Sequence, residues 1–416
     1  MITLPASKSI GARFLVASYF AGSLSSSPRF NDCDDLMVIQ QALNNLENHS
    51  TPILDIHASG TAFRFMAAVA ASTPGADITL TGTSRLCSRP MTPLLGVLRQ
   101  AGASIEALGN GDTGPFHISG TNLRGGEYEI RGDVSSQFIS AIMLVAPTWE
   151  NGLSLRFSTP LVSRPYAEMT AQVMRRFGIK VELTDRGVSV ESGKYIAPED
   201  FSVEADWSAA GFFYEACSFR DAPLEIADLA SPSESLQGDS ATARLFEGMG
   251  VESIFNKRHA IIQRRFDLPG LLEADLSHNP DLAPAFAVAC ALNSCHFRFS
   301  GVRNLRLKEC DRLEAISNEL GKLGYNLSVG DDHIEWNGDM SDRQNPAVIE
   351  TYDDHRIAMA FAMAALRTGE IRIANPDVVE KSFADFWNQL PKLGLNCLRD
   401  GEIMTVTDST SNSCRI

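Results

Sequence analysis

Short apolar runs, each preceded by small polar residues, recur along this chain of 416 residues. The runs are nearly continuous in Ala, Phe, Met, Ile and Val, which is typical of helices that are buried on all sides. After the first interval they return roughly every 70 residues, a period that indicates repeated supersecondary units. The predicted buried helices lie at residues 14–21, 65–71, 138–146, 211–217, 283–292 and 357–366.

A second, amphipathic helix follows most of these runs and ends near a glycine that leads into a strand. Pro93 suits the first turn of one such helix, and Gly102 supplies a left-handed C-cap after it. The alternating residues beyond each glycine predict a half-exposed strand. We expect these helices at residues 92–100, 166–176, 241–249, 312–323 and 383–393, with strands at 102–106, 178–183, 250–254, 324–329 and 394–398. Further strands are expected between the two helices, at residues 77–80, 153–157, 224–226, 296–299 and 371–373.

The predicted unit is therefore a buried helix, a strand, an outer helix and a strand, repeated six times. Six units divide most simply into two α/β domains of three units each. We expect the first domain at residues 8–204, and the second at residues 1–7 and 205–416. No Gly/Ser-rich linker marks the crossings near Ser7 and Glu204, which favours a hinge over a tether.

Composition and charge narrow the class of partner. The chain is 44% hydrophobic and 21% charged with a net charge of −15, which argues against binding to nucleic acid or to an acidic membrane. No apolar run is long enough to span a bilayer, and the N-terminus does not resemble a signal peptide. The eight cysteines lack metal-ligand spacing, so we expect reduced thiols, no metal and a cytoplasmic protein.

The cations are gathered at the predicted helix starts, where they favour a small anionic ligand. A helix N-terminus offers unpaired N–H groups and a partial positive charge. One such end has the cations Lys8 and Arg13, and another has Arg64. Gly60, beside Arg64, would let a ligand approach the backbone closely. Taken one at a time, these clusters are equally explained as ordinary capped helices.

Three acidic or basic positions in the second half have open interpretations. Asp281 precedes a predicted helix and serves either as its N-cap or as a functional carboxylate. Arg356, at the start of another apolar run, is either structural or functional. Glu309 lies one residue after Lys308 and three before Arg312, where its ionised form is favoured and suits proton transfer or charge stabilisation.

Taken together, the polar clusters resemble those of the enolpyruvyl transferase family. The matching segments occur in the family's order from residue 5 to residue 383, and jointly they are highly specific. They are residues 5–9, 13, 59–64, 89–91, 132–138, 163–166, 237–239, 280–281, 304–312, 353–356 and 381–383.

This resemblance implies a fold and a reaction. The fold is a two-domain inverse α/β barrel, with three repeated units per domain and buried parallel helices. The reaction, in the branch that the segments resemble most, joins phosphoenolpyruvate to the 5-hydroxyl of shikimate 3-phosphate and releases phosphate by addition and elimination. No metal or organic cofactor is implied, the only partners are the two substrates, and a monomer is expected.

The resemblance also implies roles for individual residues. The first domain would provide the shikimate 3-phosphate side, and the second the phosphoenolpyruvate and catalytic side. Shikimate 3-phosphate would contact Ser9, Arg13, Ser135, Ser136, Gln137, Ser163 and Tyr166, and also Asp281, Asn304 and Lys308. Phosphoenolpyruvate would contact Lys8, Gly60, Arg89, Arg312, Arg356 and Lys381. Asp281 would accept the hydroxyl proton, and Glu309, with Lys8 or Lys308, would handle the proton at C3.

Some positions depart from the family pattern, and two alternatives stay open. Gly11 and Ala12 replace a usual Ser-Asn pair, Ala58 a common asparagine, and Phe65 a common proline. The branch that uses UDP-N-acetylglucosamine has an Asn beside the first lysine, where this chain has Ser9. The other alternative is a non-catalytic, ligand-binding relative.

Overall fold

The computed structural model describes residues 1–409 except 134, 257–258 and 266–267, so position 134 of the 132–138 segment lies outside the described residues. The chain forms two compact units. We call Lys8–Val203 the first domain, and Met1–Ser7 with Glu204–Ile416 the second domain. The two crossings are joined by a hydrogen bond from the Ser7 N–H to the Glu204 carbonyl (2.8 Å).

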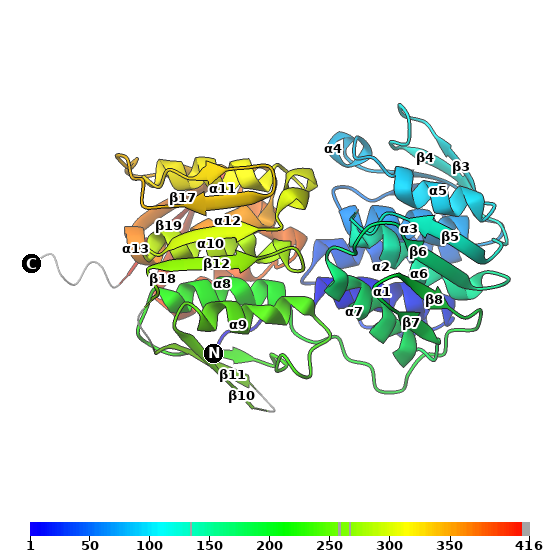
Figure 1. Ribbon diagram of the computed structural model, residues 1–416, viewed down its shortest axis with the longest axis horizontal. Helices are drawn as coiled ribbons and strands as arrows, with labels where there is room; N and C mark the ends of the chain where they lie inside the picture. The colour runs from blue at the N-terminus through cyan, green and yellow to red at the C-terminus, as the bar shows by residue number, and fades with distance from the viewer. Residues whose placement is uncertain (134, 257–258, 266–267, 410–416) are drawn as a thin grey trace, which may run out of the picture. The chain divides into compact units, whose positions relative to one another are not determined.

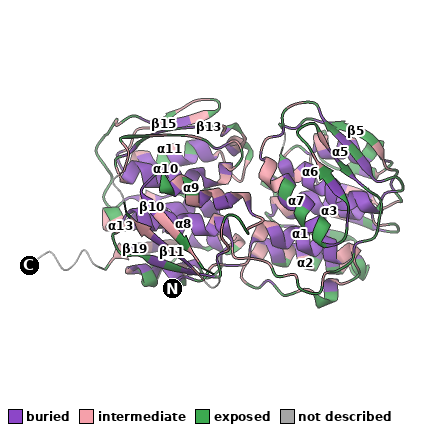
Figure 2. Ribbon diagram, turned by 60° about the horizontal axis from the view of Figure 1, so that its bottom comes forward, coloured by how far each residue is buried: buried purple, intermediate pink, exposed green. Residues whose placement is uncertain are grey.

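Three helices form the centre of the second domain. They are α8 (Trp207–Ser218), α10 (Ala283–Leu292) and α12 (His355–Met363), which pack against one another (Figure 1). Nearly every residue of these helices is buried (Figure 2). They confirm the apolar runs as buried helices, although the last run is divided by a break before α13 (Ala365–Thr368).

Within its described residues, the second domain has three sheets. Their strands are β9 (Leu224–Ala227), β10 (Val251–Phe255), β11 (His259–Arg264), β12 (Leu271–Asp275), β13 (His296–Ser300), β14 (Ser328–Val329), β15 (His333–Trp336), β16 (Val348–Ile349), β17 (Glu370–Ala374), β18 (Leu395–Asp400) and β19 (Ile403–Asp408). Two sheets share one topology, β12-β13-β15-β14 and β16-β17-β19-β18, in which only the first pair is parallel. The third, β10-β11-β9, is antiparallel, and Ile2 adds a parallel bridge at Ile226 of β9.

The outer helices of the second domain confirm the amphipathic pattern. They are α9 (Thr242–Glu247), α11 (Arg312–Lys322) and α14 (Phe386–Gln389), with the 3₁₀ turns η3 (Gly238–Ala241), η4 (Pro280–Leu282), η5 (Arg303–Leu307), η6 (Pro376–Lys381) and η7 (Leu390–Leu393). Gly324 and Gly394 follow α11 and η7 with φ of +94° and +80°, the left-handed conformation expected of a C-cap. The helix expected at 383–393 is divided between α14 and η7.

The first domain also has a centre of buried helices. These are α1 (Lys8–Phe20), α3 (Gly60–Ala71) and α6 (Ser136–Val145), which contact one another. The remaining helices are α2 (Asp34–Glu47), α4 (Ser84–Cys87), α5 (Thr92–Gln100) and α7 (Arg164–Arg176), with the 3₁₀ turns η1 (Leu24–Ser26) and η2 (Ala146–Thr148). The bounds of α5 agree with those expected from Pro93 and Gly102.

The expectation of six complete repeats is wrong for the first of them. The strands of the first domain are β1 (Ile53–Asp55), β2 (Asp77–Thr81), β3 (Ser104–Ala107), β4 (Phe116–Ser119), β5 (Gly126–Ile130), β6 (Leu153–Phe157), β7 (Val181–Leu183) and β8 (Gly187–Val190). Within the described residues they form two sheets, β1-β2-β4-β3 and β5-β6-β8-β7. Between α1 and α2 the chain has Gly22, several serines and Pro28, a composition that favours turns over strands.

An irregular segment, residues 191–203, packs on α1 instead of a third sheet. The ring of Phe201 stacks on Phe14 of α1 with centroids 4.8 Å apart, and Tyr195 stacks near Phe20 at 6.0 Å. The Tyr195 hydroxyl donates to the Leu144 carbonyl (2.7 Å), which fixes the segment to the end of α6. Aromatic contacts therefore cover part of the first repeat where a sheet was expected.

Candidate active site

A cluster of carboxylates and cations lies at the helix starts of the second domain. We call it the carboxylate–cation cluster; its members are Asp281, Lys308, Glu309, Arg312, Asp354, Arg356 and Lys381. Asp281 is its hub, because one carboxylate oxygen lies 2.8 Å from Arg312 and 3.2 Å from Lys308. The other oxygen lies 3.1 Å from an Arg356 nitrogen.

Arg312 is the best-buried cation of the cluster, with 1% of its surface exposed. Its Nε donates to Asp354 (2.6 Å), and its terminal nitrogens donate to Asp281 and Glu309 (both 2.8 Å). Glu309 also accepts from Lys381 at 3.0 Å. Carboxylates thus hold this guanidinium from three directions, and Lys381 is linked to it through Glu309.

The geometry favours one of the two interpretations of Asp281. Asp281 lies in η4, just before α10, and among the described residues its carboxylate accepts from Arg312 and Arg356 rather than from a helix N-terminus. Burial by itself would raise the pKa of Asp281, but Arg356, Lys308 and Arg312 hold that pKa well below its ordinary value. The carboxylate is therefore ionised at neutral pH and belongs to the charged cluster.

Asn304 lies in η5, and Lys308 directly follows that turn. Burial lowers the pKa of the Lys308 ammonium, and Asp281 opposes that shift. A lysine with a lowered pKa transfers protons more readily near neutral pH. The Asn304 side-chain oxygen is buried and has no hydrogen-bond partner among the described residues, so it is available to a ligand hydroxyl.

The first domain holds Arg13 by a different set of groups. Its Nε donates to the Thr170 hydroxyl (2.7 Å), one terminal nitrogen to the Ser9 carbonyl (2.7 Å), and the other to the Ser140 hydroxyl (3.0 Å) and the Tyr166 carbonyl (3.2 Å). We call these five residues the Arg13 network. Burial lowers the pKa of Arg13 to about 10, which still leaves it charged at neutral pH.

The predicted lysine of the first domain is paired. Lys8 is the first residue of α1, and its ammonium lies 3.1 Å from the carboxylate of Asp35 in α2. Asp35 is buried, because it lies on the apolar face of α2. The pair holds the Lys8 side chain toward α2 at the start of α1.

The polar residues at the starts of α6 and α7 lie in specific local conformations. Ser135 is the N-cap of α6, with Ser136 as its first residue, and the Gln137 amide donates to the Thr61 hydroxyl of α3 (3.0 Å). Ser163 precedes α7 in the left-handed region at φ 51°, an uncommon conformation for a residue with a side chain. Residues held in such a conformation often occur at functional sites.

Gly60 has a steric role that its sequence context only partly indicated. A methyl group at this position would lie 2.8 Å from an Arg64 terminal nitrogen and 3.0 Å from an Arg89 terminal nitrogen. Arg64 also donates to the Gly60 carbonyl at 2.6 Å. Glycine therefore leaves room for two guanidinium groups beside the start of α3.

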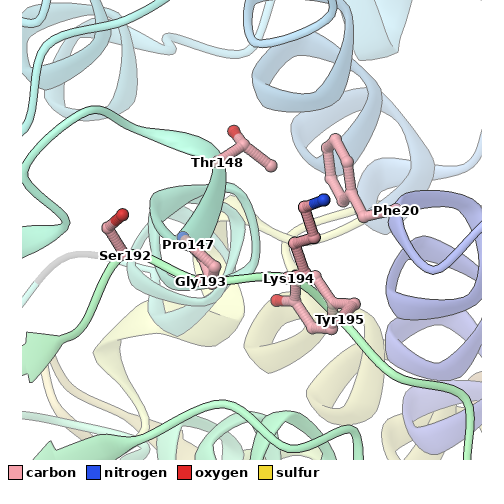
Figure 3. A pocket seen from close by; sticks show the side chains of 7 residues that line it. All are labelled: Phe20, Pro147, Thr148, Ser192, Gly193, Lys194 and Tyr195. Atoms are coloured by element: carbon pink, nitrogen blue, oxygen red, sulfur yellow. The ribbon is translucent and has the colours of Figure 1, made fainter.

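A pocket elsewhere in the first domain shares no residue with the predicted site. Its volume is about 380 Å³, and it lies beside residues 191–203 (Figure 3). Its lining comprises Phe20, Pro147, Thr148, Ser192, Gly193, Lys194 and Tyr195. It is distinct from the Arg13 network on the same domain.

Metal-binding clusters, disulfides and membrane-spanning helices are absent from the described part of the chain. No group of His, Cys, Asp and Glu side chains there is arranged to hold a metal ion, and none of its cysteines is in a disulfide. No helix there has the length and apolar character needed to cross a membrane.

Sequence reasoning missed several residues that hold the predicted site together. Asp354 was noted only as part of a helix start, yet it caps α12 and binds Arg312. Asp35, Ser140 and Thr170 were not singled out. A carboxylate on an apolar helix face was a signal for Asp35, whereas single hydroxyls within helices carry little signal.

Comparison with known proteins identifies the family. The sequence model of EPSP synthase (3-phosphoshikimate 1-carboxyvinyltransferase) matches residues 1–390. A 3-phosphoshikimate 1-carboxyvinyltransferase of Bacteroides fragilis is 40% identical over 396 residues, covering 94% of this chain and 95% of that protein. The chain belongs to the EPSP synthase family. The enzyme of that name from Shewanella halifaxensis is 32% identical, with 94% and 96% of the two chains covered.

Solved structures agree in fold. An EPSP synthase structure from Acinetobacter baumannii has a TM-score of 0.70 over 94% of this chain and 95% of that one, at 24% identity. The mixed α/β fold of the chain is therefore similar to that of EPSP synthases. Family membership supports the shikimate-pathway enzyme over the UDP-N-acetylglucosamine branch and over a non-catalytic relative.

Proposed function

We propose that this protein transfers the enolpyruvyl group of phosphoenolpyruvate to the 5-hydroxyl of shikimate 3-phosphate and releases phosphate. The observation that carries the proposal is the Asp281 hub, an ionised carboxylate in contact with Lys308, Arg312 and Arg356, in a chain of the EPSP synthase family. A base beside a set of phosphate-binding cations suits this addition and elimination.

Shikimate 3-phosphate is assigned to polar groups of both domains. In the first domain, hydroxyls at helix starts and the Arg13 guanidinium suit its phosphate and carboxylate. In the second, the unpartnered oxygen of Asn304 suits a ring hydroxyl. The proposed contacts are Ser9, Arg13, Ser135, Ser136, Gln137, Ser163, Tyr166, Asp281, Asn304 and Lys308.

Phosphoenolpyruvate is assigned to the remaining cations. Arginine suits its phosphate and carboxylate groups because the guanidinium can donate two parallel hydrogen bonds. Gly60 contributes by leaving room for Arg89. The proposed contacts are Lys8, Arg89, Arg312, Arg356 and Lys381.

The proposed reaction begins with attack of the 5-hydroxyl oxygen on C2 of phosphoenolpyruvate. Asp281 accepts the hydroxyl proton while C3 gains a proton, from Glu309 together with Lys8 or Lys308. In the second stage the group that protonated C3 takes a proton back from it, the bond from C2 to the phosphate oxygen breaks, and the double bond between C2 and C3 re-forms. The proton held by Asp281 leaves with the phosphate. The atoms balance without a cofactor, so positioning and electrostatics are the means of catalysis.

Substrate binding also tunes the proposed base. Without ligand, Arg356, Lys308 and Arg312 hold the pKa of Asp281 well below its ordinary value, which makes the carboxylate a weaker proton acceptor. Phosphate and carboxylate groups that bind Arg312 and Arg356 offset part of this positive charge, and so raise the pKa of Asp281. The carboxylate becomes a better base when both substrates are present.

Finer structural expectations accompany the proposed function. We propose that each domain has the inverse α/β barrel arrangement, with parallel helices inside and sheets outside, and that the first domain has lost the sheet of one repeat. We also propose a cytoplasmic monomer, for which the acidic composition and the scattered cysteines are the support.

Phosphate release from purified protein tests the function. Phosphate should appear only when phosphoenolpyruvate and shikimate 3-phosphate are both present, with one enolpyruvyl product per phosphate by mass spectrometry. UDP-N-acetylglucosamine in place of shikimate 3-phosphate should give no release. Release with the UDP sugar alone as acceptor, or no release with either, would reject the proposal.

A further inference from the structure

The ring of Phe65 lies against the guanidinium of Arg13. The central guanidinium carbon is 5.5 Å from the ring centroid, and both residues are almost fully buried, with 1% and 2% of their surfaces exposed. Phe65 is in the middle of α3 and Arg13 is in α1, so the contact joins two of the central helices of the first domain. The enolpyruvyl transferase pattern commonly has a proline at position 65, so this contact is not part of that pattern.

Arg13 is a buried cation without a carboxylate partner in the described part of the chain. A guanidinium has five N–H groups. The four hydrogen bonds of the Arg13 network lie at its edges and come from α1, α6 and α7, which leaves one N–H on the nitrogen that donates to Ser9. The negative face of an aromatic ring is a favourable surface for such a cation.

Edge and face contacts restrain different motions of the same group. The hydrogen bonds hold the edges of the guanidinium, whereas the attraction of its central carbon to the Phe65 ring, 5.5 Å away, draws the group toward the face of that ring. The direction of the remaining N–H therefore depends on both sets of contacts. An aliphatic side chain at position 65 would keep the site apolar but would lose the electrostatic attraction to the face.

We infer that Phe65 is a positioning residue that acts through Arg13 on the affinity for shikimate 3-phosphate. The inference rests on the proposed function, in which Arg13 contacts that substrate. Phe65 itself is almost fully buried and is not among the proposed substrate contacts. Its replacement changes the orientation of the Arg13 guanidinium, and so it weakens shikimate 3-phosphate binding while phosphoenolpyruvate binding is unaffected.

Phe63 provides a matched control in the same helix. It is also 1% exposed, and its ring packs against Phe116 with centroids 5.7 Å apart, not against a guanidinium. Phe65→Leu and Phe63→Leu each remove a buried ring from α3, so both should lower the thermal unfolding temperature. A purely structural role for Phe65 predicts the same substrate affinities in the two variants.

Calorimetric titration with shikimate 3-phosphate and steady-state kinetics separate these outcomes. Phe65→Leu should weaken shikimate 3-phosphate binding by about 2- to 30-fold, the range of a cation–π contact. Its KM for phosphoenolpyruvate and its kcat should stay within about twofold of wild type, because uniform binding alone is lost. Phe63→Leu should bind shikimate 3-phosphate as wild type does.

A double-mutant cycle shows whether the effect passes through Arg13. In an Arg13→Met background, Phe65→Leu should have no further effect on shikimate 3-phosphate affinity, because the cation is already absent. Additive effects, or equal loss of affinity in Phe65→Leu and Phe63→Leu, would overturn the inference alone. Wild-type protein that neither binds shikimate 3-phosphate nor releases phosphate would instead overturn the proposed function.

Discussion

Arg312 in the second domain and Arg13 in the first are both buried arginines at predicted substrate positions, yet their partners differ in kind. Arg312 donates to three carboxylates, those of Asp281, Glu309 and Asp354. Arg13 donates only to neutral hydroxyl and carbonyl oxygens. Burial lowers the pKa of Arg13, whereas for Arg312 the surrounding carboxylates outweigh burial and raise the pKa well above its ordinary value.

This difference separates two ways of preparing a cation for an anionic substrate. In the second domain, a substrate phosphate must compete with carboxylates that already hold the arginine, but those carboxylates supply the base and proton-transfer groups. In the first domain, none of the described carboxylates competes with the substrate for Arg13. The arrangement in the second domain suits catalysis, and the arrangement in the first domain suits substrate binding.

The largest effect is expected on removal of the hub carboxylate. Asp281→Ala should lower kcat by about 10²- to 10⁴-fold, the usual range for a general base. Shikimate 3-phosphate should still bind, because its contacts in the Arg13 network remain. Phosphate-release kinetics and calorimetric titration measure the two properties separately. Turnover within about tenfold of wild type would show that Asp281 is not the base.

The contrast between the two arginines is tested by their stability at different pH values. Arg312→Leu should cost about 3–5 kcal/mol of unfolding free energy near pH 8, because Asp281, Glu309 and Asp354 each lose a cation partner. Without it, the folded-state pKa of Asp281, which Arg312 helps to hold low, rises. The folded variant then binds more protons, so the loss should shrink as the pH falls toward about 4–5.

Arg13→Leu is the matched variant in the first domain. Thr170 keeps hydrogen bonds to Ser140 and to the Tyr166 carbonyl (both 2.8 Å), so the cost should be smaller, about 1–3 kcal/mol. This cost should also change little between about pH 5 and pH 8, because the Arg13 pKa of about 10 lies above that range. Urea unfolding followed by circular dichroism measures both, and equal pH slopes would contradict the comparison.

Glu215 is an exception within the charged second domain. It is fully buried in α8, and its carboxylate oxygens have no partner among the described residues. Burial raises the pKa of Glu215 well above its ordinary value, so the folded state keeps the proton that the unfolded chain loses. Its contribution to stability is greatest below the unfolded-state pKa and falls as the pH rises above it.

Substitution of Glu215 should therefore be stabilising. Glu215→Leu should raise the unfolding free energy by about 1–3 kcal/mol at pH 8 and by less at pH 5. At pH 8 the unfolded wild-type chain releases the Glu215 proton, which favours unfolding, whereas at pH 5 it does so less. Glu319 is the control, because it is equally buried but accepts from Lys322, Tyr352 and the Glu350 N–H. Glu319→Leu should be destabilising. Destabilisation by both variants would mean that Glu215 has an unseen partner.

The smallest effect is expected at Gly60. Gly60→Ala should displace the guanidinium groups of Arg64 and Arg89, and so raise the KM for phosphoenolpyruvate by about tenfold with little change for shikimate 3-phosphate. Gly96 in α5 has nothing within 4 Å of an added methyl group. Gly96→Ala should leave both KM values unchanged and add about 0.5–1 kcal/mol of stability. Equal effects of Gly60→Ala on both substrates would place Arg89 outside the phosphoenolpyruvate subsite.

Most of the secondary structure could be predicted because its signals are local. Pro93 and Gly102 define the ends of α5, and the continuous apolar run at 283–292 coincides with α10. That the described residues of the first domain form two sheets and not three could have been suspected from the serines between α1 and α2. The segment at 191–203 that covers α1, however, is distant in sequence. Such coverage depends on tertiary packing, which no local pattern encodes.

The candidate site was predicted in its charges but not in its connections. Six-fold repetition and the family resemblance indicated Asp281, Lys308 and Arg312, which the fold brings together. The sequence did not predict that Asp354 would hold Arg312 or that Thr170 would hold Arg13. An aspartate that caps a helix and a threonine within a helix both have common structural roles. Whether a carboxylate or a hydroxyl holds an arginine is decided by which helices meet.

The bridge between Ile2 and Ile226 also affects the order in which the chain can fold during synthesis. Roughly two hundred residues separate the two strands of this contact, and at about 5–20 residues per second the ribosome needs about 10–40 s to make them. The first domain lies entirely within that interval. Residues 1–7 therefore cannot pair with β9 while the first domain is being synthesised. They can pair with the edge of β9 only after β9 has emerged from the ribosome.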